Sequence, residues 1–296
     1  MKILITGASG FIGSELSEYF KIAGHQVFPM KRGDNRQKEP FFWSPDEGTI
    51  HFDKTKPIDV VINLAGENLS AGRWTKSRKD KLRNSRIQST EILSKKIASL
   101  PQKPKLLISA SAIGFYGYNT IQKVDENSPP GKGFLAELCR HWELSTRPAA
   151  ESGIRTVNLR LGMVFSFKGG ILGKLLPIFK FGFGGRIGDG KQMMSWIGLV
   201  EMGPIIDFII AKENIYGPVN AVSPNPLTNN EFTRILGEKL KKPVRLIVPK
   251  FLLIQRFGEM ARELILSSTH AIPQCLISNG YKFKIENFSD CADIYL

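Results

Sequence analysis

The chain of 296 residues contains few of the residues that build disulfides and metal sites. Its three cysteines and four histidines are widely separated: Cys139, Cys275, Cys291, His25, His51, His141 and His270. They include no close-spaced set of metal ligands. We therefore expect neither a disulfide nor a bound metal.

Long apolar runs are also missing. No run reaches the roughly 18 to 20 residues that a membrane-spanning helix needs. A strand pattern that begins at residue 2 leaves no room for a signal peptide. With 42% hydrophobic residues, the chain can still bury a full core. We expect a soluble, cytoplasmic globular protein without membrane contact.

Acidic residues are scarce relative to basic ones, 27 against 41, which gives a formal net charge of +14. Such a surface attracts polyanions, and nucleic acid is one candidate partner. The densest basic stretch, Arg73 to Arg86, is interleaved with an apolar stripe through Leu82 and Ile87, which indicates an amphipathic helix with a solvated face. No nucleic-acid motif is present, so we expect no such partner. One or two of these cations are candidates to bind cofactor phosphates.

Three glycines near the N-terminus join a strand pattern to an amphipathic helix pattern over residues 11–23. Gly7 allows the chain to turn off the strand, Gly10 allows the backbone to approach a diphosphate, and Gly13 allows the helix to pack closely on the strand. The first N–H groups of the helix then point at the anion. A second strand pattern at residues 26–31 completes a β-α-β unit, which favours a dinucleotide site over a chance turn.

Strand patterns recur along the first half of the chain, at Lys2–Thr6, Gln26–Met30, Thr49–Phe52, Ile58–Leu64, Lys105–Ala110 and Arg155–Leu161. Helix patterns lie between most of them, the longest over residues 76–100 and 133–152. This alternation predicts an α/β fold with a Rossmann-type, doubly wound parallel sheet.

After Gly162 the alternation loosens. Residues 169–192 are rich in glycine and aromatic residues, and we interpret the segment at about 166–195 as loops on the substrate side. A helix is predicted over residues 229–240, and short helices after Val248. We therefore expect a dinucleotide-binding domain over residues 1–222 and a small, mainly helical C-terminal domain over 245–296.

Three motifs, in this order, resemble the extended short-chain dehydrogenase/reductase superfamily of nucleotide-sugar epimerases and dehydratases: Thr6-Gly-Ala-Ser-Gly-Phe-Ile-Gly13, Asn63-Leu-Ala-Gly66 and Phe115-Tyr-Gly117. Longer runs look like an atypical subgroup described as epimerase-family proteins or NADP-dependent oxidoreductases with a short C-terminal domain of unknown function: residues 63–68, 73–74, 169–177 and 182–190. The resemblance covers nearly the whole chain. It implies an epimerase/dehydratase-type domain over residues 1–222, but no established reaction.

The resemblance also implies which residues bind the cofactor. The diphosphate would be surrounded by Gly7, Ser9, Gly10, Phe11, Ile12 and Gly13. Leu64, Ala65 and Gly66 would line the adenosine side, where the alternative is a buried strand ending in a turn. The backbone at Val164 would meet the nicotinamide carboxamide. Lys81 and Arg86 on the long helix are candidates to face the phosphates, and an exposed helix face is the alternative.

The end of the second strand carries Lys31 and Arg32. A carboxylate there would bind the ribose 2′-OH and repel a 2′-phosphate, whereas cations attract it. The general basicity of the chain and the nearby Asp34 weigh against this interpretation. We predict NADP (NADPH) as the cofactor, with NAD less favoured.

The superfamily uses a tyrosine for proton transfer and a lysine four residues later that lowers its pKa. Alignment on Glu143 puts Leu135 in the tyrosine position and Cys139 in the lysine position. Neither side chain can perform that chemistry. Cys139 is predicted to be a small packed residue rather than a nucleophile.

The hydroxyl groups that remain near the fifth strand are Ser109, Ser111 and Tyr116, and these are our candidate catalytic residues. A polar strand end and aromatic packing are the alternatives. Glu137 and His141 are weaker candidates for the missing acid.

Two functions follow from these observations. The first is an NADP-dependent oxidoreductase or epimerase that acts on a small carbonyl or sugar-like substrate, with Arg186, Lys191 or Gln192 as candidate substrate contacts. The second is a non-catalytic NADP-binding redox sensor or scaffold, because the tyrosine and lysine are missing. The substrate itself stays unidentified, and a homodimer is our expectation for the assembly.

Overall fold

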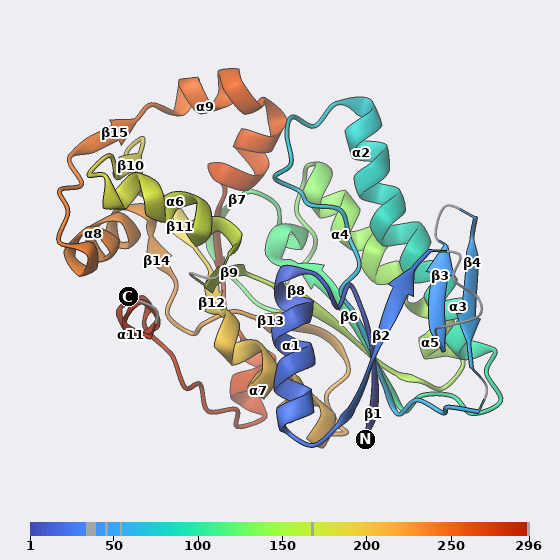
Figure 1. Cartoon of the computed structure of the whole chain (residues 1–296). Coiled ribbons are helices and arrows are strands. Elements are labelled where there is room, and N and C mark those ends of the chain that lie inside the picture. Colours follow the sequence, from blue (N-terminus) through green and yellow to red (C-terminus); the bar gives the residue numbers. More distant parts are fainter. Residues whose placement is uncertain (34–39, 45–46, 54, 167–168, 295–296) are drawn as a thin grey trace.

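The computed structural model describes residues 1–33, 40–44, 47–53, 55–166 and 169–294 (Figure 1). Its centre is an eight-stranded sheet in the order β13-β8-β6-β5-β1-β2-β3-β4, in which only the pair β3 and β4 is antiparallel. The strands are β1 (Lys2–Thr6), β2 (Gln26–Arg32), β3 (Phe41–Ser44), β4 (Thr49–Phe52), β5 (Val60–Asn63), β6 (Leu106–Ala112), β8 (Arg155–Leu161) and β13 (Gly217–Ala221). The predicted Rossmann-type, doubly wound sheet is confirmed.

The winding of the chain reverses at β1, which has β2 on one side and β5 on the other. Sheets of this kind bind ligands at the carboxyl ends of their strands, beside this reversal. The six predicted strands are all present. The sequence patterns missed β3 and β13, and β13 is an edge strand that contains Pro218, a residue that weakens a strand pattern but is tolerated at an edge.

Helices cover both faces of the sheet (Figure 1). Ile5 of β1 shares a buried cluster with Phe20 and Ile205 on one face, while the adjacent Leu4 shares one with Leu93 and Ile97 on the other. The helices are α1 (Phe11–Ile22) and α7 (Met202–Ala211) on the first face, and α2 (Lys76–Arg83), α3 (Ser89–Ala98), α4 (Phe134–Leu144) and α5 (Arg147–Glu151) on the second.

Both long predicted helices are interrupted. A π-helical turn, Asn84–Gln88, lies between α2 and α3. The segment 133–152 divides at Ser145 and Thr146 into α4 and α5, because these side chains donate to the carbonyl oxygens of Trp142 (2.6 Å) and Glu143 (2.7 Å). Such side-chain bonds satisfy carbonyl groups that a continuing helix would use.

The prediction of loops over 169–192 was wrong in part, because an 11-residue helix, α6 (Gly170–Lys180), occupies half of the segment. Its glycines lie mainly at the ends, at Gly169, Gly170 and Gly182. Leu172 and Phe179 bury one face of the helix. Tertiary packing of that face therefore overrides the low helix propensity of the segment.

The remaining elements form a lobe beside the main sheet (Figure 1). The predicted helix over 229–240 is confirmed as α8. The last segment contains short helices, as expected, but also a strand, β16, which pairs with β7 and joins the C-terminal region to the preceding chain. The elements are β7 (Asn119–Val124), β9 (Met163–Ser166), β10 (Gly185–Ile187), β11 (Met193–Met194), β12 (Trp196–Gly198), β14 (Leu227–Thr228), α8 (Asn229–Leu240), β15 (Leu246–Val248), α9 (Lys250–Phe257), β16 (Ser268–Ala271), α10 (Gln274–Ser278) and α11 (Phe288–Asp293).

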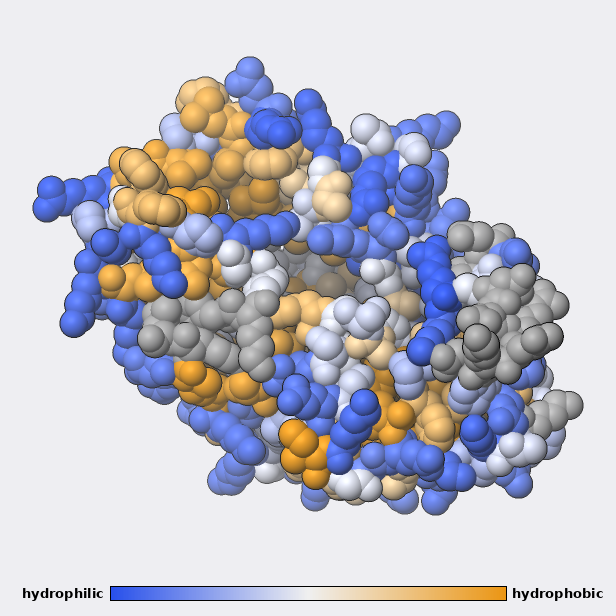
Figure 2. All heavy atoms as spheres, in the orientation of Figure 1, coloured by the Kyte–Doolittle hydropathy of each residue, from blue (hydrophilic) through white to orange (hydrophobic). Residues whose placement is uncertain are grey.

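The surface of this lobe carries exposed apolar side chains (Figure 2). Phe181 and Phe183 follow α6, Ile247 lies in β15 and Phe251 lies in the first turn of α9, and all four are more than half exposed. Contiguous apolar surface of this kind is a candidate site of interaction. Within the described residues, none of the helices is long and apolar enough to cross a membrane.

Candidate functional site

The three glycines form a tight cradle at the carboxyl end of β1. Gly7 has φ +67°, a conformation that glycine adopts without strain. A Cβ atom added to Gly7 would lie 2.9 Å from the carbonyl oxygen of Leu64, and one added to Gly13 would lie 2.1 Å from the carbonyl oxygen of Gly7. The Gly10 N–H donates to the Gly7 carbonyl oxygen at 2.9 Å. Neither Gly7 nor Gly13 leaves space for a side chain.

A pocket of about 310 Å³ opens beside this cradle. No side chain caps the N-terminus of α1 there, so its first N–H groups are available to an anion. The ring of Phe11 lies against Gly169 and Gly170, which bring the start of α6 to the same place. The lining residues are Ser9, Gly10, Phe11, Ser14, Glu15, Gly169, Gly170 and Leu199.

The segment after β5 is held by the end of β1. Thr6 Oγ1 accepts from the N–H groups of Leu64 (3.1 Å) and Ala65 (3.2 Å), and donates to Asn63 Oδ1 (2.7 Å). Leu64, Phe11, Ile12 and Val164 pack against the same core cluster, so the structure brings these predicted cofactor residues together. Val164 lies in β9 and pairs with Ile197.

Lys31 and Arg32 end β2 at the same edge of the sheet, just beyond Met30, which is level with Thr6. Both cations are exposed. Asp34, which complicated the choice between NADP and NAD, lies outside the described residues.

The two cations predicted on the long helix have different environments. Lys81 is exposed on α2. Arg86, in the π-helical turn, is only 7% exposed and lies beneath Gly66, with Nη2 donating to the carbonyl oxygen of Glu67 at 2.8 Å. Its guanidinium group therefore does not lie on a solvated helix face.

The three candidate catalytic hydroxyls are all buried and hydrogen-bonded inside the protein. Ser109 Oγ accepts from Asn63 Nδ2 at 3.1 Å, and Ser111 Oγ donates to Glu143 Oε1 at 2.7 Å. Tyr116 Oη donates to Asn220 Oδ1 at 2.8 Å, and burial raises its pKa to about 12. Their part in catalysis stays a prediction, and the geometry gives each of them a structural partner.

Arg160 connects this network. Its guanidinium group makes a two-point ion pair with Glu143 (2.8 and 2.9 Å) and donates to Tyr116 Oη (2.9 Å), and it lies 3.5 Å from the centroid of the Phe115 ring. Sequence reasoning used Glu143 only for alignment and missed Arg160. The sequence offered no distinct signal, because Arg160 follows Thr156 and Asn158 at the polar positions of an alternating strand pattern.

Leu135 and Cys139 are buried on α4 and pack against the turn that follows β6. A Cβ added to Gly114 would lie 3.3 Å from Leu135 Cβ and 3.8 Å from Cys139 Sγ. Burial is the main cause that raises the pKa of Cys139 to about 12, so the group is a thiol and not a thiolate at neutral pH. Glu137 and His141 are exposed on α4.

The N-terminus of α4 is capped by a residue far away in the sequence. Glu263 Oε1 and Oε2 accept from the N–H groups of Phe134 (2.9 Å) and Leu135 (2.8 Å). Gly133, at φ +109°, provides no side-chain cap, and a Cβ there would lie 2.7 Å from Glu263 Oε1. The C-terminal region therefore caps α4, the helix that carries Leu135 and Cys139.

The candidate substrate contacts do not form one group. Lys191 is exposed and Arg186 is partly exposed, whereas Gln192 is buried and donates to the Ile187 carbonyl oxygen at 3.2 Å. Lys174 of α6 instead reaches Ser70 at 3.1 Å, and so links α6 to the segment after β5.

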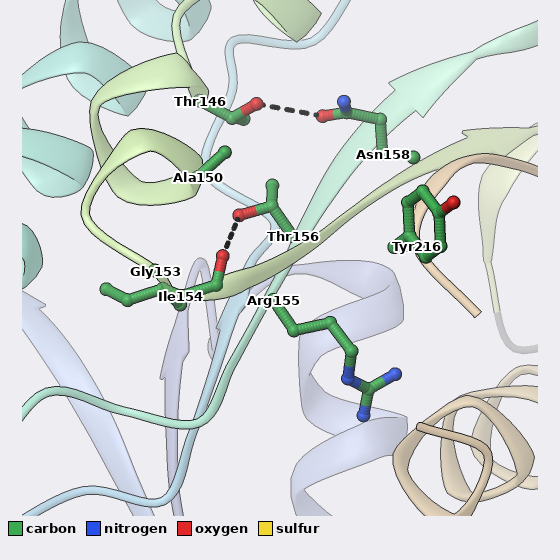
Figure 3. Close-up of a pocket in the computed structure, with 9 residues that line it drawn as sticks. Thr146, Ala150, Gly153, Ile154, Arg155, Thr156, Asn158 and Tyr216 are labelled. Atoms are coloured by element: carbon green, nitrogen blue, oxygen red, sulfur yellow. Dashed lines mark hydrogen bonds between the residues drawn. The ribbon is translucent and has the colours of Figure 1, made fainter. Parts of the chain in front are cut away.

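A second pocket, of about 440 Å³, lies at the amino end of β8 (Figure 3). Arg155 at this end donates to the carbonyl oxygens of Ile209, Ile210, Lys212 and Ile215. Ligands of doubly wound sheets bind at the opposite, carboxyl edge. The pocket beside Gly10 is therefore the candidate cofactor site.

Comparisons with known proteins found family matches over most of the chain. Residues 3–220 match the NAD dependent epimerase/dehydratase family, and residues 248–292 match a domain of unknown function (DUF1731). The epimerase family protein Mb2239 of Mycobacterium bovis is 41% identical over 281 residues, which cover 95% of this chain and 93% of that protein.

Two solved structures are also similar. The human epimerase family protein SDR39U1, solved with NADPH, has a TM-score of 0.88 and 28% identity, with 99% of this chain and 98% of that chain covered. A nucleoside-diphosphate sugar epimerase of Corynebacterium glutamicum has a TM-score of 0.80 and 32% identity, with 98% of this chain and 57% of that one covered.

Proposed function

Because the chain belongs to the NAD dependent epimerase/dehydratase family, we propose that it is an NADPH-binding oxidoreductase acting on a small carbonyl or sugar-like substrate. The observation that carries the proposal is the pocket beside Gly10, at the uncapped N-terminus of α1. A helix N-terminus approached through glycines attracts a diphosphate.

The proposal assigns the parts of the cofactor to named residues. The backbone from Gly7 to Gly13 holds the diphosphate, and Lys31 and Arg32 attract the 2′-phosphate. Leu64 to Gly66 and Val164 line the remaining walls, and Lys81 is a candidate phosphate contact from α2. The NADPH bound to the human relative supports NADP over NAD.

When bound, the nicotinamide supplies or accepts a hydride. The chain itself orients the cofactor and excludes water at the carboxyl edge. The buried positions of Ser109, Ser111 and Tyr116 favour a role in positioning the strand end, since their hydroxyls already have partners inside the protein.

That observation also favours the second candidate function, a non-catalytic NADP-binding sensor or scaffold. The two functions differ in turnover, which we would follow by the absorbance of NADPH over a panel of carbonyl compounds and nucleotide sugars. Turnover that is lost in Ser109→Ala, Ser111→Ala or Tyr116→Phe, with unchanged thermal stability, supports catalysis. Tight NADPH binding without turnover on any substrate supports the sensor, and no NADPH binding rejects both.

The homodimer expected from the sequence is part of this proposal, with the exposed side chains after α6 and on α9 as the candidate contact. Light scattering would measure the molar mass of the wild type and of the double variant Phe181→Ser/Phe251→Ser, and so their oligomeric state. A cytoplasmic location also stays part of the proposal.

A further inference from the structure

Arg86 is placed in the interior by an irregular turn. The helical segment from Lys76 to Ala98 widens into the π-helical turn Asn84–Gln88, and Arg86 lies at its centre. A π-turn shifts the residues after it to another face of the helix, and such turns are frequent at functional sites. The side chain of Arg86 is 7% exposed, whereas the cations of the adjoining helices α2 and α3 are exposed or partly exposed.

The guanidinium group of Arg86 bonds to neutral groups. It donates to the carbonyl oxygens of Glu67 (2.8 Å) and Leu82 (3.4 Å), and lies 5.1 Å from the centroid of the Trp142 ring. In the part of the chain that the structure describes, no carboxylate oxygen lies within 4.0 Å of it, and the Glu67 carboxylate pairs with Arg78 instead, at 3.1 Å.

This environment is unusual for a buried charge. Arg160, the comparable buried cation, is neutralised by Glu143. Burial lowers the pKa of Arg86 to about 10, so the group still carries its charge at neutral pH. Burying a charge without a counter-ion is costly, which indicates that a bound ligand completes the environment of Arg86.

The position of Arg86 identifies the part of the ligand that it faces. A dinucleotide at the α1 N-terminus extends across the carboxyl edge of the sheet, with adenosine toward β2 and nicotinamide over β5 and β6. Gly66 follows β5, and a Cβ there would lie 3.1 Å from Arg86 Cζ. Cys139 packs at the end of β6, over which the nicotinamide lies, and is close enough to Arg86 for each group to affect the pKa of the other. The side chain of Arg86 therefore reaches from the Gly66 segment, expected on the adenosine side, toward the nicotinamide side.

We propose that Arg86 faces the nicotinamide half of bound NADP and makes the site prefer NADPH to NADP⁺. The inference rests on the proposed function, since it presumes that NADP binds. The oxidised ring carries a positive charge that the reduced ring lacks, and a guanidinium group in a poorly solvated site repels it. The ribose hydroxyls accept hydrogen bonds from Arg86 in both states, so only the ring charge separates them.

Calorimetric titration of the full chain with NADPH and with NADP⁺ tests the proposal. Arg86→Gln should lower the ratio of the two dissociation constants by about tenfold, the size expected for one charge at close range. Arg86→Lys retains the charge and should keep the ratio within about twofold. Lys95→Gln removes an exposed cation from α3 as a control and should leave both constants unchanged.

An unchanged ratio in an Arg86→Gln variant that still binds NADPH overturns the inference. If the wild type binds neither form, the proposed function fails instead. Should Arg86→Gln not fold, the wild type is titrated with 2′-phospho-ADP-ribose, which lacks the ring. The inference requires NADPH to bind more tightly than this probe, and NADP⁺ to bind no more tightly than the probe does. Any other order of the three affinities overturns it.

Discussion

Two regions along the carboxyl edge of the sheet are built from different parts of the chain. Beside β1, the cradle consists of backbone atoms of consecutive residues, from Gly7 to Gly13. Beyond β6, the corresponding region consists of side chains that come together from distant segments, with Arg160 at the centre of Glu143, Tyr116 and Asn220. The first region has no space for side chains, whereas the second depends on pairs of them. Mutations in the first should therefore act mainly on cofactor binding, and mutations in the second mainly on stability.

The largest effect on stability is expected in the side-chain region. Arg160→Met leaves Glu143 buried without its partner and should lower the free energy of unfolding by about 3–5 kcal/mol. Its effect on NADPH affinity in the folded protein should be below about threefold. Urea unfolding and calorimetric titration measure the two. Arg147→Met, which breaks the exposed pair with Glu151, is the control and should cost less than about 0.5 kcal/mol. Equal losses in both variants would contradict the assignment.

The cradle should respond mainly in binding. Gly13→Ala puts a methyl group 2.1 Å from the Gly7 carbonyl oxygen, so α1 must move away from β1. We expect NADPH affinity to fall by more than about 100-fold and stability by about 3 kcal/mol. Gly173→Ala in α6 meets no atom within 4 Å and should stabilise the protein by about 0.5–1 kcal/mol. Wild-type affinity in Gly13→Ala would remove the distinction between the regions.

A third variant examines how the C-terminal region supports the side-chain region. Glu263→Gln removes the charge that caps α4, and we expect a loss of about 1–2 kcal/mol in the free energy of unfolding. Hydrogen exchange should also become faster at the N–H groups of Phe134 and Leu135. Glu259→Gln, in the partly exposed pair with Lys79, serves as the control. No change in exchange would show that α4 does not depend on this cap.

The smallest effect concerns cofactor choice at the end of β2. Arg32→Asp should weaken NADPH binding by about tenfold and NADH binding by less than about twofold, because only NADPH carries the 2′-phosphate. The control is Lys21→Asp near the C-terminal end of α1, which makes the same change of charge far from this edge of the sheet. Titration with both cofactors gives the result, and equal losses for NADPH and NADH would count against NADP.

The centre of the sheet was predictable because β1, β5 and β6 are short, largely apolar runs that are buried on both faces. The glycine cradle was predictable because Gly7, Gly10 and Gly13 approach one another within seven consecutive residues, whereas the contact of Gly7 with Leu64 comes from the fold. Helix α6 was not predictable. Its helical state depends on the burial of Leu172 and Phe179 in a core that also contains Phe232 and Phe288, far along the chain.

The rest of the site depends on the same kind of distant contact. Nothing near Gly133 indicates that Glu263 caps α4, and nothing near Tyr116 indicates that its hydroxyl is held by Arg160 and Asn220. The sequence alone identified Ser111 and Tyr116 as hydroxyls close to the strand end, but not that both have internal partners.

The sequence by itself therefore determined the dinucleotide-binding fold and the glycine cradle, because both follow from local patterns of burial and backbone conformation. Only the tertiary structure decided which charges are buried: Arg160 in an ion pair with Glu143, and Arg86 with no carboxylate oxygen within 4.0 Å among the residues that the structure describes. The physical reason is that burial and pairing depend on every segment that packs around a group, and these segments come from positions throughout the chain.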